Sequence, residues 1–153
     1  MVSAGILLYR REAGVLEVLL AHPGGPFWAK RDEGAWSLPK GEAGAGEDYL
    51  EVARREFEEE IGIPLPCDLP RSLGSVTQRS GKIVHGWACE GDVDPARQRS
   101  NTFSMEWPPR SGRTEEFPEI DRVAWFPLQQ ARRKLNPAQV AFLDRLLDLI
   151  EES

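Results

Sequence analysis

The chain has 153 residues and an acidic balance, with 25 Asp and Glu against 19 Lys and Arg and a formal net charge of -6. A chain of this length can form one hydrophobic core without a disulfide framework, and its charge argues against non-specific nucleic-acid binding, which needs a basic surface. No apolar run approaches the roughly 20 residues of a membrane-spanning helix. We therefore expect a single domain over residues 1–153, with no nucleic-acid or membrane partner.

The chain contains two cysteines, Cys67 and Cys89, which lack the CxxC spacing of a structural zinc site. We expect both to be reduced thiols. The basic residues near the N-terminus follow a short apolar run, whereas a secretory signal places them before a longer one. These two features together predict a cytoplasmic location.

The first half of the chain predicts a hairpin, a loop and a helix. Apolar runs at residues 3–9 and 16–21, separated by a Gly-containing turn, are typical of two antiparallel strands. Residues 22–36 are rich in Pro, Gly and aromatic side chains, which favours a loop that forms the wall of a site. Apolar residues then recur at helical spacing over residues 48–61, with an Asp at the N-cap and Gly62 as a left-handed C-cap.

The second half predicts further strands and a final helix. The expected strands are residues 72–79, 82–90, 101–107 and 122–126, of which the first two form another hairpin. Polar loops are expected at residues 91–100 and 108–116. Asn136 is typical of an N-cap and Pro137 of a first helical turn, and an apolar stripe continues from there to Ile150. This order of elements predicts the α/β class.

The most informative segment is the acidic end of the first helix. Glu58, Glu59 and Glu60 occupy its last turn, where the helix dipole disfavours an exposed anion by about 0.3–1 kcal/mol. Glu56 lies three and four positions before Glu59 and Glu60, so these three carboxylates share one face and repel one another. An acidic run on a helix is usually a solvated face. Repelling carboxylates at the unfavourable helix end instead suit divalent cations, and Mg²⁺ favours oxygen ligands together with substrate phosphates.

The same glutamates belong to a longer motif. It is a Gly, five residues, Glu, seven residues, and then Arg-Glu-apolar-any-Glu-Glu-any-Gly-apolar, over residues 41–63. The matching positions are Gly41, Glu47, Arg55, Glu56, Phe57, Glu59, Glu60, Gly62 and Ile63. The chain therefore resembles the Nudix hydrolases, and the order of its expected elements is compatible with that family over nearly the whole length.

The resemblance implies a fold and a reaction. The fold is an α/β/α sandwich with a mixed β-sheet, and the reaction is Mg²⁺- or Mn²⁺-dependent cleavage of a nucleoside diphosphate linked to another group, with water attacking phosphorus. Carried over by position, Glu56, Glu59 and Glu60 hold the metals directly or through water. Glu47 and Arg55 form an ion pair that braces the loop against the helix.

Further site residues are implied around the motif. The backbone carbonyl of Lys40 is a metal ligand by analogy, and Gly41 lets that backbone approach the metal closely. Glu116 and Glu119 are candidates for an additional metal-binding carboxylate, although each also fits an ordinary solvated loop residue. The general base stays open between Glu56 and a glutamate outside the motif.

The substrate is less determined than the family. The segment around the motif resembles diadenosine tetraphosphate hydrolases and their relatives that act on diphosphoinositol polyphosphates. The first group tends to carry a Tyr some sixteen to eighteen residues past the motif, and ADP-ribose hydrolases prefer a Pro there. This chain has Arg79, Ser80 and Gly81 in that window, so it has neither the Tyr nor the Pro. How the protein recognises a base or a sugar therefore stays open.

Several side chains are candidates for substrate binding. Lys40 and Arg79 suit phosphate contacts. Trp28 and Trp36 flank the loop before the motif and suit stacking on a base, with core packing as the alternative. His22 has no evident partner and is expected at the surface, at the end of a strand.

These observations predict a metal-dependent pyrophosphohydrolase for a small nucleoside polyphosphate, with dinucleoside polyphosphates favoured. The alternatives are a pyrophosphatase for nucleoside triphosphates, ADP-ribose or diphosphoinositol compounds, and a non-catalytic nucleotide-binding module of the same fold. The protein is expected to be a monomer or homodimer. Three mutually repelling carboxylates favour the enzyme, because a binding module has no need to keep them.

Overall fold

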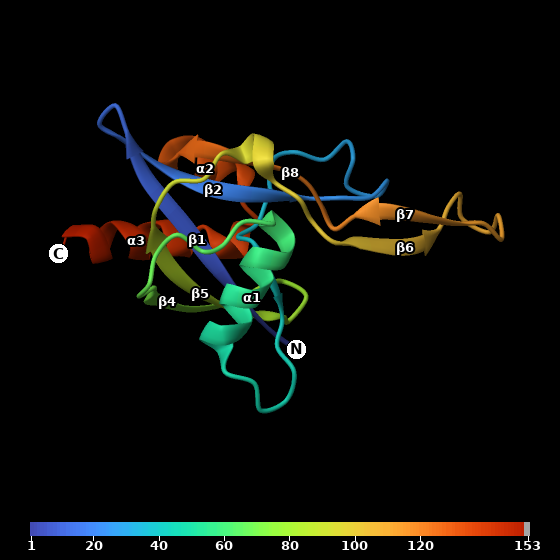
Figure 1. Cartoon of the computed structure of the whole chain (residues 1–153), viewed down its shortest axis with the longest axis horizontal. Helices are drawn as coiled ribbons and strands as arrows, with labels where there is room; N and C mark the ends of the chain where they lie inside the picture. Colours follow the sequence, from blue (N-terminus) through green and yellow to red (C-terminus); the bar gives the residue numbers. More distant parts are fainter. Residues whose placement is uncertain (152–153) are drawn as a thin grey trace.

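A computed structural model describes residues 1–151, and its centre is a mixed six-stranded sheet (Figure 1). The strand order is β4-β5-β1-β2-β8, with β3 paired to the N-terminal part of β1. Strands β1 and β5 are parallel, and the remaining pairs are antiparallel. The strands are β1 (Val2–Glu12), β2 (Val15–Pro23), β3 (Lys40–Glu42), β4 (Arg71–Thr77), β5 (Ile83–Glu90) and β8 (Ile120–Pro127).

Helices cover both faces of this sheet. Because side chains alternate along a strand, Ile6 and Leu8 of β1 pack with Phe57 of α1 (Tyr49–Ile61) on one face. Leu7 packs on the other face, in a cluster with residues of α2 (Leu128–Lys134) and α3 (Ala141–Glu151). Figure 1 shows α1 in front of the sheet and α3 behind it. The α/β/α sandwich with a mixed sheet is therefore confirmed.

Helix α1 has the caps that its sequence predicts. The Asp48 side chain accepts hydrogen bonds from the backbone N–H groups of Leu50 and Glu51, which satisfies two of the free donors at the helix start. Gly62 has a φ of 77° and donates its N–H to the carbonyl of Glu58. This left-handed residue ends the helix directly after its acidic turn.

The predicted hairpins and the two later strands are confirmed, but several short elements were not predicted. Strand β3 is three residues long, and its extended conformation depends on pairing with β1. Helix α2 buries only Ala131, so it has no apolar stripe to reveal it. The final helix is split, with a 3-10 turn η2 (Pro137–Gln139) followed by α3. A second 3-10 turn, η1 (Pro95–Arg97), interrupts the loop predicted at residues 91–100.

The loop predicted at residues 108–116 is wrong in part, because its end forms a strand. Strands β6 (Thr102–Glu106) and β7 (Thr114–Pro118) make a two-stranded arm that projects from the sandwich (Figure 1). Phe103 and Phe117 are cross-strand partners, with their ring centroids 6.0 Å apart. In β7 the other side chains are exposed, so this strand lacks the apolar alternation that allowed β6 to be predicted.

Two local predictions are overturned. Cys67 and Cys89 form a disulfide rather than two reduced thiols, because the fold brings the segment after α1 against β5, with a Cα–Cα distance of 5.9 Å. His22 is fully buried, and its ring contacts Asp121 Oδ1 at 2.9 Å and the Arg31 carbonyl at 2.6 Å. Arg31 lies in the loop that follows β2, whereas Asp121 is 99 positions away in the chain.

Within residues 1–151, no helix has the length and apolar character needed to cross a membrane. The prediction of one domain over residues 1–153 stays a prediction, and residues 152 and 153 lie outside the described part.

The packing of α1 can be tested at Phe57, which is fully buried between the helix and the sheet. Phe57→Ala should lower the free energy of unfolding by about 3–5 kcal/mol, because it removes buried apolar surface and leaves a cavity. Urea denaturation followed by circular dichroism measures the change. Phe27→Ala is the matched control, since Phe27 is 61% exposed, and it should shift stability by no more than about 0.5 kcal/mol. Equal effects of the two substitutions would contradict the assigned core.

Candidate active site

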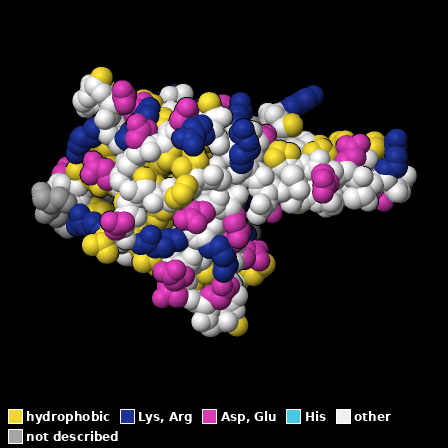
Figure 2. Space-filling view, viewed as in Figure 1, with side chains coloured by type: hydrophobic (Ala, Val, Ile, Leu, Met, Phe, Trp, Pro, Cys, Tyr) yellow, Lys and Arg dark blue, Asp and Glu magenta, His cyan; other side chains and the backbone are white. Residues whose placement is uncertain are grey.

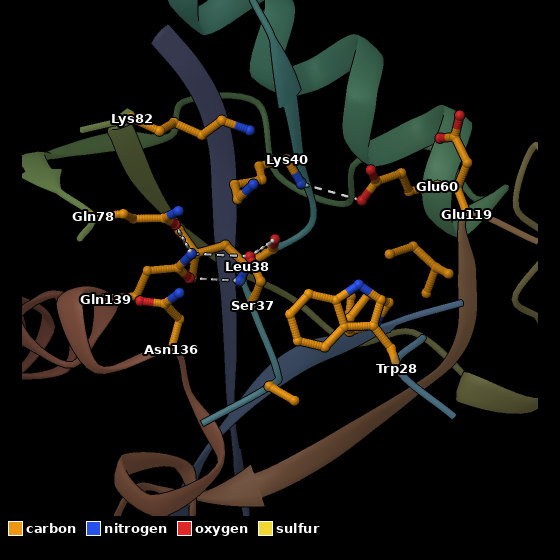
Figure 3. Close-up of a pocket in the computed structure, with 14 residues that line it drawn as sticks. Trp28, Ser37, Leu38, Lys40, Glu60, Gln78, Lys82, Glu119, Asn136 and Gln139 are labelled. Carbon is orange, nitrogen blue, oxygen red and sulfur yellow. Dashed lines mark hydrogen bonds between the residues drawn. The ribbon is translucent and has the colours of Figure 1, made fainter. Parts of the chain in front are cut away.

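A cavity of about 350 Å³ opens beside β3, where the C-terminal end of α1 meets the loop before β8 (Figure 3). This volume lies in the range of small-molecule sites. Its lining includes Lys40 and Glu60 from the predicted motif region, and Trp28 and Glu119 from the flanking loops. Figure 3 shows Glu60 and Glu119 at one end of the cavity and a group of amide side chains at the other.

Glu60 is the most buried carboxylate of the site, with 7% of the residue exposed. Its Oε1 accepts a hydrogen bond of 3.2 Å from the backbone N–H of Lys40. Burial raises the pKa of the Glu60 carboxyl to about 8, against the opposing effect of that hydrogen bond and of the Lys40 charge. A buried carboxylate with one partner is an unfavourable group in the isolated protein, and a cation would compensate for it.

Glu56 lies directly over the backbone of Gly41. A Cβ added at Gly41 would overlap the Glu56 carboxylate, so this position has no room for a side chain. Burial and the neighbouring charge of Glu59 raise the pKa of Glu56. Glu59 itself is exposed on the same helix. The approach of this backbone to a metal stays a prediction, and the group that lies against Gly41 in the structure is the Glu56 carboxylate.

Glu47 and Arg55 form an ion pair, with 2.7 Å between Glu47 Oε2 and the Arg55 guanidinium. The other carboxylate oxygen, Oε1, accepts a hydrogen bond of 2.6 Å from Gly44 N–H. These contacts hold the pKa of Glu47 below its usual range, with the Arg55 hydrogen bond as the main cause. Arg55 also approaches Glu56 Oε1 at 3.8 Å. The pair thus ties the loop before α1 to the helix, next to the carboxylates.

The Lys40 side chain is half-buried in the cavity wall. Burial lowers the pKa of its ammonium group, and the nearby charge of Lys82 lowers it further. Lys82 also lines the cavity, and its Nζ lies 3.6 Å from Glu42 Oε1. Trp28 lies across the cavity from the amide side chains (Figure 3). Lys40 and Trp28 are therefore placed where a substrate could contact them.

Three other candidates lie away from the cavity. Trp36 is 3% exposed, and its ring packs edge-to-face on Phe126 in the core, so substrate cannot reach it in this structure. Arg79 is exposed at the β4–β5 turn and Glu116 is exposed on the arm, and neither lines the cavity. Glu119, the residue between β7 and β8, does line it. Of the two carboxylates considered outside the motif, the fold thus brings only Glu119 to the site.

Sequence reasoning missed the amide side chains of the cavity. Gln78, Asn136 and Gln139 come from the β4–β5 turn and from η2, which are far apart in the chain. Asn136 was recognised only as a helix cap. No periodicity or motif connects these positions, so only the tertiary structure reveals the cluster.

The donor set of the site fits a hard cation. In the described part of the chain, no three His, Cys, Asp or Glu side chains are grouped closely enough to enclose a metal by themselves. Mg²⁺ does not require such a cage, because it is commonly bound by one or two carboxylates with waters and substrate phosphates. Glu56 and Glu60 suit this role, and burial is the main cause that raises the pKa of both carboxyl groups. Figure 2 shows further Asp and Glu side chains over the α1 face.

Comparisons with known proteins agree with this fold. The family model described as NUDIX domain matches residues 1–146. An RNA pyrophosphohydrolase from Erythrobacter litoralis (strain HTCC2594) is 32% identical over 126 residues, which cover 66% of this chain and 75% of that protein. A binary complex of C. elegans Ap4A hydrolase superimposes with a TM-score of 0.71 at 20% identity, covering 99% of both chains. The NUDIX domain of Shewanella oneidensis NrtR, solved with ADP ribose, gives 0.64 at 13% identity, covering 98% of this chain and 88% of that one.

Glu60 yields a stability prediction for the metal-free protein. Its pKa rises from 4.5 to about 8 on folding, so the folded state loses stability as pH increases from about 4.5 to about 8. Glu60→Gln keeps an acceptor for Lys40 N–H and cannot ionise. In EDTA at pH 7.5 it should melt at a higher temperature than the parent protein, and the difference should vanish near pH 4.5.

The matched control is Glu58→Gln, because Glu58 is an exposed glutamate of the same helix turn. It should show no such pH-dependent gain. An unchanged or lower melting temperature for Glu60→Gln at pH 7.5 would show that Glu60 is not an unfavourable buried acid.

Proposed function

This chain belongs to the NUDIX domain family and is a hydrolase of phosphoric anhydride bonds, and from that premise we propose that its substrate is a nucleoside polyphosphate. Dinucleoside polyphosphates such as diadenosine tetraphosphate are the favoured class. The observation that carries the proposal is the pair Glu56 and Glu60, held against the backbone of Gly41 and Lys40, with Glu60 lining a nucleotide-sized cavity.

The residues of this chain divide the work of such a reaction. Glu56, Glu60 and the Lys40 carbonyl would hold the cation, with exposed Glu59 contributing through water. Bound Mg²⁺ or Mn²⁺ would neutralise phosphate charge and lower the pKa of a coordinated water. Arg55 and Glu47 keep the loop and helix aligned. Glu119 lies at the same end of the cavity and is the candidate outside the motif for an additional ligand or a general base.

The other lining residues suit the remainder of the substrate. Lys40 and Lys82 place two cationic side chains along the wall, which suits a chain of several phosphates. Trp28 offers an aromatic face for a base, a contact worth about 1–3 kcal/mol in other nucleotide complexes. These features favour a small ligand with several phosphates and at least one base. The Cys67–Cys89 disulfide removes one of the two features on which the cytoplasmic location was predicted, so that location stays a proposal, with a monomer or homodimer as the proposed assembly.

A second candidate substrate is a 5′-phosphorylated RNA end. It is favoured by the RNA pyrophosphohydrolase to which the chain is 32% identical. The acidic balance of the chain argues against extended RNA binding, because each phosphate contact needs local positive charge. The two candidates share the anhydride chemistry and differ in how much of the ligand lies outside the cavity.

The cation-binding role can be tested with Glu56→Gln and Glu60→Gln. Each should lower kcat/KM by at least about 100-fold, because loss of groups that merely support metal ligands already costs 10- to 100-fold. Hydrolysis is measured with saturating Mg²⁺ and after EDTA treatment, which should abolish it in the parent protein. Glu58→Gln should leave kcat/KM within twofold of the parent value. Full activity of a folded Glu56/Glu60 double variant would refute the assignment.

The substrate class can be tested with a panel and product identification. The compounds are diadenosine tetraphosphate, nucleoside triphosphates, ADP-ribose, a diphosphoinositol polyphosphate and a 5′-triphosphorylated RNA oligonucleotide. We expect the highest kcat/KM with the dinucleoside tetraphosphate. A flat profile, or activity confined to triphosphates or RNA, would contradict the dinucleoside preference while leaving the anhydride hydrolysis intact.

A further inference from the structure

The amide end of the cavity contains a hydrogen-bond relay whose direction is fixed by the backbone. The N–H of Leu38 can only donate, and it donates to Gln139 Oε1 at 3.0 Å. Gln139 is fully buried, so its amide cannot turn without leaving that N–H unpaired. The Nε2 group of Gln139 must therefore point the other way.

The relay continues from Gln139 to Gln78. Gln139 Nε2 donates to Ser37 Oγ at 3.0 Å and to Gln78 Oε1 at 3.0 Å. Ser37 cannot reverse this direction, because its hydroxyl hydrogen is used in a 2.8 Å bond to the Leu38 carbonyl. Gln78 must accordingly present its oxygen to Gln139. Figure 3 shows these bonds as a chain along one wall of the cavity.

As a result, the Nε2 group of Gln78 is left as a donor at the cavity. It has no hydrogen-bond acceptor among residues 1–151. The main chain of Gln78 is itself fixed, because its N–H donates to Lys82 O and its carbonyl accepts from Gly81 N–H, both at 2.8 Å. A preorganised donor of this kind needs no rearrangement when a ligand binds.

The neighbouring groups have the same polarity. Asn136 Oδ1 accepts from Ala138 N–H at 3.0 Å, which directs the Asn136 Nδ2 group away from that contact. The ammonium groups of Lys40 and Lys82 add further donors. The carboxylates of the cavity lie at its other end (Figure 3). The amide end of the cavity thus presents hydrogen-bond donors and few acceptors to a ligand.

We propose that Gln78 is a specificity-determining residue that donates a hydrogen bond from Nε2 to an acceptor on the substrate, and that Gln139 is the positioning residue that fixes this polarity. The ligand chemistry is an acceptor edge, supplied either by the keto oxygen of a nucleobase or by a phosphate oxygen. A base with an amino group at that edge would face a donor with a donor. For the adenine-containing substrate favoured above, the acceptor is therefore a phosphate oxygen, whereas a base with a keto oxygen could itself accept the bond. This inference rests on the proposed function, because it concerns the same cavity.

The experiment measures dissociation constants by calorimetry in EDTA for ITP, ATP and inorganic tripolyphosphate. ITP and ATP carry the same phosphate chain and differ in a keto or amino group on the base. Gln78→Met removes the donor without adding charge. Gln129→Met is the matched control, because Gln129 is an exposed glutamine on α2 outside this cavity.

A contact with the base predicts that Gln78→Met weakens ITP binding by roughly 3- to 10-fold, the effect of one hydrogen bond, and leaves ATP and tripolyphosphate unchanged. A contact with a phosphate predicts the same loss for all three ligands. Either result supports the proposal and identifies the source of the acceptor. Losses below threefold for every ligand, relative to Gln129→Met, would overturn it.

Gln78→Glu and Gln139→Met test the polarity and the relay. Gln78→Glu keeps an oxygen for Gln139 and places an acceptor at the cavity. The ratio of ATP to ITP affinity should therefore rise if residue 78 contacts the base. Gln139→Met leaves Gln78 free to rotate, so the effect of Gln78→Met should shrink in the double variant, with melting curves confirming that the protein folds. An unchanged ratio together with an undiminished Gln78→Met effect would refute the positioning role.

Failure of the proposed function gives a different result. In that case the parent protein would hydrolyse none of the polyphosphates with Mg²⁺, whereas the dissociation constants in EDTA would still report on Gln78. Hydrolysis by a parent protein whose ligand affinities do not respond to Gln78 would reject this inference alone.

Discussion

The site depends on the hydrogen bond from Lys40 N–H to Glu60, which connects the last turn of α1 to strand β3. Strand β3 is in turn held in place by pairing with β1. The bond holds a carboxylate at a position where burial makes ionisation unfavourable. The large apolar contacts of α1 with the sheet offset this local cost. The site is therefore built from a helix end that is unfavourable in isolation and is tolerated because the rest of the helix packs well.

The same arrangement accounts for the acidic character of the chain. A net charge of -6 by itself repels a phosphate-rich ligand. The cavity separates the charges, with Glu60 and Glu119 at one end and Lys40, Lys82 and amide donors along the rest. A cation at the acidic end would complete a surface that is locally neutral or positive. The bulk charge of the protein thus says little about the field that a small ligand encounters.

Predictions from the sequence succeeded where local pattern and structure coincide. The caps of α1, the two hairpins of the sheet and the stripe of the last helix depend on residues close together in the chain. Predictions failed where an element is stabilised by a distant partner. Strand β7 pairs with β6 alone among the described strands, helix α2 buries one alanine, and the disulfide joins the segment before β4 to strand β5. His22 was assigned to the surface because Asp121 is 99 positions away.

The sequence by itself determined the family, the class of fold and the glutamates of α1, because a spaced motif and a helical period are properties of neighbouring residues. It also indicated the ion pair of Glu47 with Arg55, which the structure contains. The tertiary structure decided which aromatic side chain reaches the cavity, since Trp28 lines it and Trp36 is buried. It also decided that Gln78 faces a ligand as a donor, because that polarity starts from a backbone N–H 40 residues before it and passes through Gln139, 61 residues after it. Such relations depend on which segments fold together, and no local pattern encodes them.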